Sequence, residues 1–205
     1  MNLKLRKLGI QDYRKTWASM QNVILSKGNE DPDELWLLEH FPVYTLGFGA
    51  SEDHLLTESN IPVIRSDRGG EVTYHGPGQI IAYFLINLRR KNWGPKRFVN
   101  ELEASVIDFL KKYNISSSRQ SGEPGIYVKD KKISSVGLKI KRGFSYHGLS
   151  INIDMDLSPF ENINVCGNRS LKVTHLNKFA EVSIDRAFKD FEKTAKERFE
   201  GIMSR

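Results

Sequence analysis

Apolar residues in the first third of the chain predict one helix among short strands. Residues 3–8 predict an edge strand, and residues 12 to about 27 predict a helix, because apolar residues recur there at helical spacing (Trp17, Met20, Val23 and Ile24). Residues 34–45 predict a strand, in which Pro42 breaks the hydrogen-bond ladder and indicates an edge or a bend. Residues 61–67 predict a further short strand.

The remaining pattern predicts a buried strand, a helix, several strands and a last helix. The near-continuous apolar run at 80–88 is typical of a buried strand. Residues 95–113 carry one apolar helical stripe, formed by Phe98, Leu102, Val106, Phe109 and Leu110. Strands fill 125–156, and the last helix begins near Ser183, a favourable N-cap, and buries Ala187, Phe188, Phe191, Ala195 and Phe199. Strands and helices do not alternate regularly, so we predict an α+β (α/β mixed) fold: a mixed, largely antiparallel sheet flanked by helices.

Length and composition favour one globular domain. At 205 residues, with 39% hydrophobic and 27% charged residues, the chain has enough apolar content to fold alone. No apolar run approaches the ~20 residues of a membrane span, and the amino terminus has no uninterrupted apolar stretch after its charges. We therefore expect an unprocessed cytoplasmic protein without a membrane partner.

The net charge of +6 favours encounter with acidic partners. The basic residues lie in scattered clusters, such as those at 89–91, 129–132 and 139–142, without an interleaved aromatic ladder. Nucleic acid and an acidic protein fit this charge equally well.

Cys166 is the one cysteine of the chain and lies in a loop that reads SPFENINVCGN. A solitary thiol forms no intramolecular disulfide, and the glycine that follows it leaves the sulfur approachable, so Cys166 is a candidate nucleophile. The alternative is a buried cysteine that fills apolar space. One cysteine and five dispersed histidines offer no spaced ligand set, so no metal site is expected.

The segment RGGEVTYHGPGQ at 68–79 is the second candidate site. Its four glycines permit close approach of the backbone to a ligand, while Arg68 and His75 supply polar contacts at its two ends. No Gly-Lys-Ser/Thr element follows and no GxGxxG opens a helix, so a nucleotide is not indicated. The alternative is a glycine-rich hairpin in which Pro77 fixes a tight turn.

Four segments in sequence order together resemble the lipoyl(octanoyl) transferases. They are LLEHFPVYTLG at 37–47, RGGEVTYHGPGQ at 68–79, the stretch from GIYVKDKKISSVG to DMDLSPF at 125–160, and VCG at 165–167. The resemblance covers about residues 34–170 and implies a fold shared with biotin and lipoate protein ligases, with residues 1–205 forming a single acyltransferase catalytic domain. It also implies transfer of an octanoyl (or lipoyl) group from acyl carrier protein to a lysine of lipoyl domains, without a cofactor and without nucleic acid. The acceptors implied are the E2 subunits of 2-oxoacid dehydrogenases and the glycine cleavage H protein.

The resemblance also implies the catalytic residues. Cys166 forms an acyl-thioester, and the lysine directly before the hydrophobic residue of the ISSVG strand assists it, which is Lys132. Consecutive side chains of a strand point to opposite faces, so only one of Lys131 and Lys132 can face the site. Lys139 is a further candidate. A neighbouring ammonium favours thiolate over thiol, and a desolvated neutral lysine can serve as general base when the acceptor amine attacks.

The substrate contacts implied by the family pattern lie in three segments. They are Arg68, Gly69, Gly70, Glu71, Val72, Thr73, Tyr74 and His75, then Ser135, Val136 and Gly137, then Gly148, Leu149 and Ser150. The strand at 80–86, with Val136, Leu138 and Leu149, is expected to line an apolar acyl channel. His147 either acts directly in catalysis or is a turn or core histidine whose ring nitrogens are hydrogen-bonded within the fold.

Two other functions remain open from the sequence. An ATP-dependent lipoate or biotin protein ligase would share the fold but would not need Cys166, and the chain lacks the GRGRxGR-type loop expected of biotin ligases. A non-catalytic module that binds acyl carrier protein would explain the positive charge without chemistry.

Overall fold

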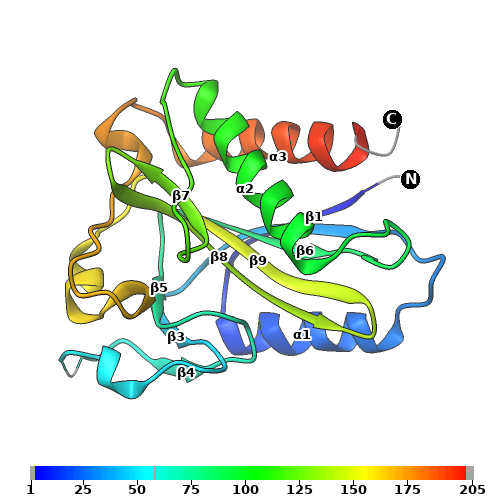
Figure 1. The fold of residues 1–205 in the computed structure, drawn as a ribbon, viewed down its shortest axis with the longest axis horizontal. Helices are drawn as coiled ribbons and strands as arrows, with labels where there is room; N and C mark the ends of the chain where they lie inside the picture. Colours follow the sequence, from blue (N-terminus) through cyan, green and yellow to red (C-terminus); the bar gives the residue numbers. More distant parts are fainter. Residues whose placement is uncertain (1–2, 58, 202–205) are drawn as a thin grey trace.

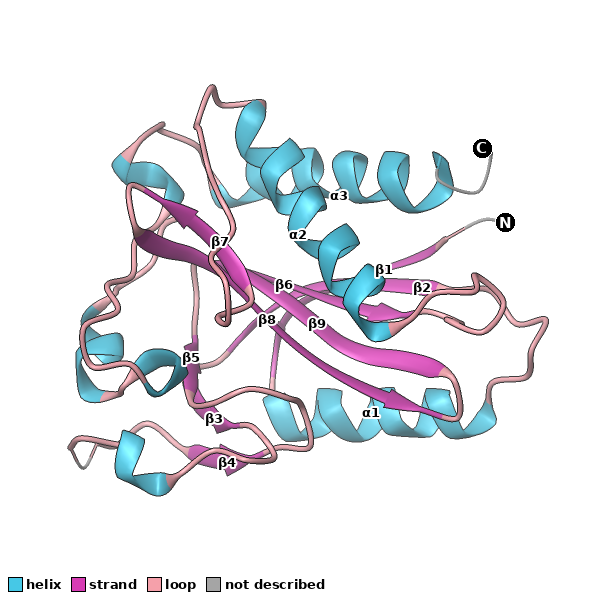
Figure 2. Ribbon diagram, in the orientation of Figure 1, coloured by secondary structure: helices cyan, strands magenta, loops and turns pink. Residues whose placement is uncertain are grey.

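A six-stranded sheet forms the centre of the computed structural model, which describes residues 3–57 and 59–201 (Figures 1 and 2). Its strands run in the order β1-β2-β6-β9-β8-β7. The bounds are β1 Lys4–Gln11, β2 Glu34–His40, β6 Gln79–Leu85, β7 Gly125–Val128, β8 Lys131–Lys141 and β9 Phe144–Asn152. Only β1 and β2 pair in parallel within this sheet, so the predicted α+β fold with a mixed, largely antiparallel sheet is confirmed.

Helices cover both faces of the sheet (Figure 1). The helix α1 (Tyr13–Ser26) lies on one face, and α2 (Pro95–Lys111) and α3 (Ile184–Gly201) lie on the other. The backbone N–H of Arg186 donates to Ser183 Oγ at 3.3 Å, so the predicted cap of the last helix is confirmed.

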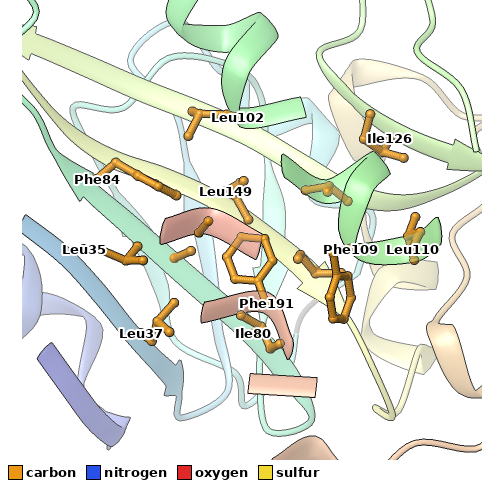
Figure 3. Close-up of a cluster of buried hydrophobic side chains, with 14 of the residues drawn as sticks. Leu35, Leu37, Ile80, Phe84, Leu102, Phe109, Leu110, Ile126, Leu149 and Phe191 are labelled. Atoms are coloured by element: carbon orange, nitrogen blue, oxygen red, sulfur yellow. The ribbon is translucent and has the colours of Figure 1, made fainter. Parts of the chain in front are cut away.

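Alternation along β2 and β6 explains why both strands are apolar throughout. Leu35 and Leu37 of β2, with Ile80 and Phe84 of β6, face the core under α2 and α3, which also holds Phe109, Leu110 and Phe191 (Figure 3). The intervening side chains face the core under α1; they are Trp36, Leu38, Ile81, Tyr83 and Leu85. Because both faces are covered, a strand with polar alternation would leave buried polar groups there.

A second, three-stranded sheet lies beside the first, in the order β4-β3-β5. Its strands are β3 Val43–Leu46, β4 Val63–Arg65 and β5 Thr73–His75. The predicted bend at Pro42 is confirmed, but the prediction of one strand over 34–45 is wrong, because the bend at Phe41 and Pro42 moves the chain from the first sheet to the second. The segment 68–79 is not a loop throughout, since β5 lies within it and pairs with β3.

Short 3-10 turns span Glu52–His54, Ser158–Asn162, Val165–Gly167 and Leu176–Lys178. The second and third pack on the small sheet, whereas Leu176 belongs to the core under α2 and α3. Phe160 and Val165 join Tyr44 and Tyr74 in one apolar cluster. The loop that carries Cys166 is therefore held on the small sheet by apolar contacts.

Candidate active site

Cys166 lies in a tight turn with an uncommon backbone conformation. Its φ is +56° and that of Gly167 is +73°, both in the left-handed region. The turn closes through Gly167 N–H to Asn164 O at 2.9 Å and Asn168 N–H to Val165 O at 3.0 Å. A non-glycine residue held at positive φ is a common feature of functional sites, and the half-buried Cys166 side chain is presented at the tip of this turn.

Lys132 points at this sulfur. Its Nζ donates to Cys166 Sγ at 2.9 Å, and its side chain is 2% exposed. The backbone of Lys132 binds the segment that follows Cys166, through Lys132 N–H to Lys172 O at 2.8 Å and Thr174 N–H to Lys132 O at 2.9 Å. The two functional groups are therefore held at fixed distance by main-chain hydrogen bonds between β8 and the 172–174 segment.

A β-bulge in β8 directly after Lys132 interrupts the regular pairing of this strand with β7. Tyr127 pairs with Lys132 and Ile126 pairs with Ser134, which leaves Ile133 as an extra residue. Lys131 is exposed, while Lys132 is buried at the site. The structure thus brings Lys132, and not Lys131, to the thiol.

Gly125 leaves the space that Lys132 occupies. A Cβ at Gly125 would lie 2.7 Å from Lys132 Cε, and the φ of +140° disfavours other residues. Tyr127 lies under the ammonium, with Lys132 Nζ 5.4 Å from the ring centroid. Burial, followed by the charge of Cys166, raises the pKa of the Tyr127 phenol, which stays a neutral hydrogen-bond donor.

A cavity of about 450 Å³ opens beside the thiol. Its lining includes Cys166, Lys132 and every predicted substrate contact except Tyr74. The Tyr74 ring packs instead on Tyr44 and Phe160, at centroid distances of 5.6 and 5.5 Å. Because Tyr74 lies on β5 between Thr73 and His75, alternation turns its side chain away from the cavity.

Fewer residues of the strand at 80–86 line the predicted acyl channel than the sequence predicted. From the strand at 80–86 the cavity is lined by Ile81 and Tyr83, since the alternate residues face the core under α2 and α3. Val136, Leu138 and Leu149 line it as expected. Lys139 also lines the cavity, and its Nζ lies 5.3 Å from the centroid of the Phe48 ring.

Arg68 organises the loop that covers the site. Its guanidinium donates to Thr45 O at 2.6 Å, Gly69 O at 2.9 Å and Glu71 O at 2.8 Å. Burial lowers the pKa of this guanidinium from its ordinary value. A Cβ at Gly137 would lie 3.1 Å from Arg68 Cδ, so a glycine on β8 lets the arginine lie across the sheet.

The same loop covers the part of the β8 edge that β7 leaves unpaired. Strand β7 pairs only with residues 131–135 of β8, and beyond it Gly69 N–H donates to Leu138 O at 2.8 Å. The cavity therefore lies where the loop at 68–72 takes the place of a neighbouring strand.

Three histidines beside the cavity are buried and neutral. Burial lowers the pKa of His40 to about 4, and burial with the charge of His40 lowers that of His75 to about 3. The Nε2 of His40 is 2.7 Å from Tyr83 Oη, and the Nδ1 of His75 is 2.8 Å from Gln79 Oε1. Burial also lowers the pKa of His147.

His147 is paired with Asp67, at 2.8 Å between Nε2 and Oδ1. Its φ of +60° breaks the alternation of β9, so its ring stacks on that of the preceding Tyr146, which also donates to Asp67. Burial opposes ionisation of Asp67, but the hydrogen bonds from His147 and Tyr146 hold its pKa at about 2. His40 and Asp67 were not predicted from the sequence as site residues, because only the folded chain brings them beside Tyr83 and His147.

Stability is expected to fall at mildly acidic pH because of these histidines. In the unfolded chain a histidine binds a proton below about pH 6.5, whereas in the folded protein His40 and His75 stay neutral down to about pH 4 and 3. The unfolded state therefore gains protons first, and the free energy of unfolding decreases as the pH falls below about 6.5. At pH 5 the loss is about 2 kcal/mol for each histidine. Urea unfolding at pH 7.5 and pH 5 measures it, and His40→Gln should flatten the dependence. Equal unfolding free energies at the two pH values would contradict the assignment of both histidines as neutral.

Comparison with known proteins gives the family. The family described as lipoyl protein ligase A/B catalytic domain matches residues 12–200. The octanoyltransferase of Vibrio atlanticus is 50% identical over 175 residues, which are 85% of this chain and 80% of that protein. The octanoyltransferase of Legionella pneumophila is 46% identical over 175 residues, 85% of this chain and 88% of that protein.

Solved structures share the fold at low identity. Lipoate-protein ligase A bound with ATP has a TM-score of 0.83 at 16% identity, and covers 98% of this chain and 86% of that one. Biotin protein ligase from Aquifex aeolicus has a TM-score of 0.59 at 14% identity, with coverage of 100% and 72%. Both likenesses concern the fold alone.

The chain belongs to the lipoyl protein ligase A/B catalytic family, as its motifs predicted. Its identity to the octanoyltransferases makes it an acyltransferase, one that moves octanoyl groups in protein lipoylation. The ATP-bound lipoate-protein ligase is only 16% identical to this chain, far below the 46–50% of the octanoyltransferases. Across residues 3–57 and 59–201, no helix is both long and apolar enough to cross a membrane.

Proposed function

We propose that the octanoyl donor is a thioester of acyl carrier protein and that the acyl group passes through Cys166, with residues 1–205 acting as a single catalytic domain. The observation that carries this proposal is the 2.9 Å contact between Lys132 Nζ and Cys166 Sγ at the wall of the cavity. A buried ammonium in contact with a thiol stabilises the thiolate, which is the attacking form.

In the first half-reaction, the Cys166 thiolate attacks the thioester carbonyl of the donor. The bond from carbon to the carrier sulfur breaks, and the departing thiolate takes a proton from the Lys132 ammonium. Cys166 then carries the acyl group as a thioester and Lys132 is a neutral amine. Because one thioester replaces another, this half-reaction is nearly balanced and reversible.

The cavity supports the binding of an acyl chain. Burial of the apolar carbons of an octanoyl chain contributes about 5 kcal/mol, at roughly 0.8 kcal/mol for each methylene. Val136, Leu138 and Leu149 on the cavity wall offer apolar surface to such a chain. Backbone N–H groups near the Cys166 turn are candidate donors to the oxyanion.

In the second half-reaction, a lysine of a lipoyl domain attacks the acyl group on Cys166. The acceptors proposed are the lipoyl domains of 2-oxoacid dehydrogenase E2 subunits and the glycine cleavage H protein. The net charge of +6 supports encounter with an acidic carrier protein. No step of this scheme requires a cofactor.

Intact-mass measurement after mixing with octanoyl-acyl carrier protein tests the proposal. We expect one added octanoyl group on the enzyme, removed by neutral hydroxylamine as a thioester is. An enzyme that stays unmodified while it octanoylates a lipoyl domain would exclude the covalent route. Modification that requires free octanoate and ATP would identify a ligase instead.

A further inference from the structure

The chemistry of the second half-reaction requires more than Lys132. A lysine acceptor arrives as an ammonium with three N–H bonds, and the amide product keeps one. Two protons therefore leave, and a neutral Lys132 Nζ can take only one of them. Water can take the other proton, and a carboxylate beside Cys166 would in addition hold the ammonium at the thioester.

We propose that Glu71 is this group: its carboxylate binds the acceptor lysine beside the acyl-thioester, an inference that rests on the proposed acyl-Cys166 function. Glu71 lines the same cavity as Cys166 and Lys132. Its Oε2 is shielded from solvent and, within the described part of the chain, accepts no hydrogen bond. A carboxylate oxygen in this state is suited to an incoming N–H donor.

The position of Glu71 relative to the nucleophile is fixed by Gly167. A Cβ at Gly167 would lie 3.7 Å from Glu71 Cγ, so the glutamate side chain packs directly on the turn that carries the sulfur. His54 packs on the same turn, with Nε2 3.2 Å from that Cβ position and 3.9 Å from Glu71 Oε2. The backbone of His54 accepts from Asn164 N–H at 2.9 Å, which ties this group to the Cys166 turn.

The loop leaves the Glu71 carboxylate available. Arg68, the nearest buried cation of the loop, donates to the main-chain oxygen of Glu71 at 2.8 Å. The glutamate side chain is 35% exposed although its Oε2 is shielded, so a proton on the carboxylate can return to solvent through the exposed part of the side chain. An acceptor lysine that enters the cavity would meet this charge beside the thioester.

The proton steps then balance. The acceptor ammonium, held by Glu71, passes one proton to the carboxylate, and the freed lone pair attacks the carbonyl carbon to form the C–N bond. The nitrogen of the tetrahedral intermediate passes a second proton to Lys132 Nζ. The C–S bond breaks, the Cys166 thiolate departs, and the thiolate–ammonium pair is restored, while Glu71 releases its proton to solvent.

Glu123 provides a matched control, because it is a second glutamate on the cavity wall with its carboxylate already occupied. Tyr127 Oη donates to Glu123 Oε2 at 3.1 Å, and Asn168 Nδ2 donates to Glu123 Oε1 at 3.1 Å. Replacement of either glutamate by glutamine preserves shape and removes one negative charge.

The experiment measures the two half-reactions separately for wild type, Glu71→Gln and Glu123→Gln. Each enzyme is acylated with octanoyl-acyl carrier protein, and the acyl-enzyme is then mixed with a lipoyl domain or with hydroxylamine, a neutral nucleophile. For Glu71→Gln we expect acylation and hydroxylamine cleavage within about twofold of wild type, and transfer to the lysine slowed about ten- to one-hundred-fold. For Glu123→Gln we expect transfer and hydroxylamine cleavage to change by the same factor, because its carboxylate is bound to Tyr127 and Asn168 and does not hold the acceptor lysine.

Three results would overturn the role of Glu71. They are wild-type transfer by Glu71→Gln, an equal loss in transfer and hydroxylamine cleavage, and an equal loss in both glutamine variants. Normal acylation of Glu71→Gln shows that the variant is folded. Absence of an acyl-enzyme on the wild type would instead refute the proposed covalent route, so the two failures are distinguishable.

Discussion

Cys166→Ala is expected to abolish octanoyl transfer, with a loss on the order of a thousandfold or more. Without the sulfur no acyl-thioester forms, and the acceptor lysine would have to attack the carrier thioester directly. Alanine also removes the partner of the buried Lys132 ammonium. Transfer of octanoyl groups to a lipoyl domain, followed by mass spectrometry of the domain, measures the loss.

Cys166→Ser tests whether another nucleophilic atom at this position can replace the sulfur. It retains a nucleophilic atom at the same turn, but a hydroxyl ionises far less readily than a thiol, so Lys132 cannot generate the attacking anion. We expect serine to restore little activity and to accumulate an ester that hydroxylamine cleaves slowly. Transfer by Cys166→Ala at a tenth of the wild-type rate would show that the covalent intermediate is dispensable.

Much of the fold could be predicted from periodicity, because burial on two faces dictates the sequence of a strand. The near-continuous apolar run at 80–88 predicted a covered strand, and β6 has α1 on one side and α2 with α3 on the other. The errors lie where the chain changes sheets. Pro42 signalled a bend, but no local pattern tells that β3 leaves the sheet of β2 to pair with residues 73–75.

The site was predictable where a local motif carries it and not where tertiary contacts assemble it. The glycines and Arg68 of the 68–75 segment are contiguous, so the motif indicated a cradle. Tyr74 was wrongly included among the cavity contacts, because the side of a residue in a strand depends on a pairing that the sequence does not display. His54 could not be found, since it reaches Gly167 through a contact between residues far apart in the chain.

The bulge at Ile133 accompanies the placement of Lys132, and not Lys131, at the thiol. Regular alternation allows either Lys131 or Lys132 to face the site, and the two are chemically identical. With the extra residue in β8, Lys132 and Ile133 are both buried, although neighbours in a regular strand face opposite sides. The main-chain bonds to the 172–174 segment then fix Lys132 opposite the thiol.

Lys132→Met is therefore expected to slow acylation of Cys166 by about a hundredfold or more, while Lys131→Met leaves it unchanged. Methionine fills the buried volume of the Lys132 side chain without its charge, so the fold should be retained, and the thiolate loses its neighbouring ammonium. Lys131 is exposed, so its replacement removes one solvated charge.

The pH dependence distinguishes loss of this charge from loss of structure. In Lys132→Met the thiol has to ionise without assistance, so acylation should rise with pH through the range near 8.5 where ordinary thiols ionise. A misfolded variant would show no such recovery. Transfer to the acceptor should stay slow even at high pH, because the neutral amine that takes the second proton is missing. Stopped-flow acylation and single-turnover transfer of both variants between pH 6 and about 9.5 measure these effects, and slow acylation by Lys131→Met alone would move the assignment by one residue.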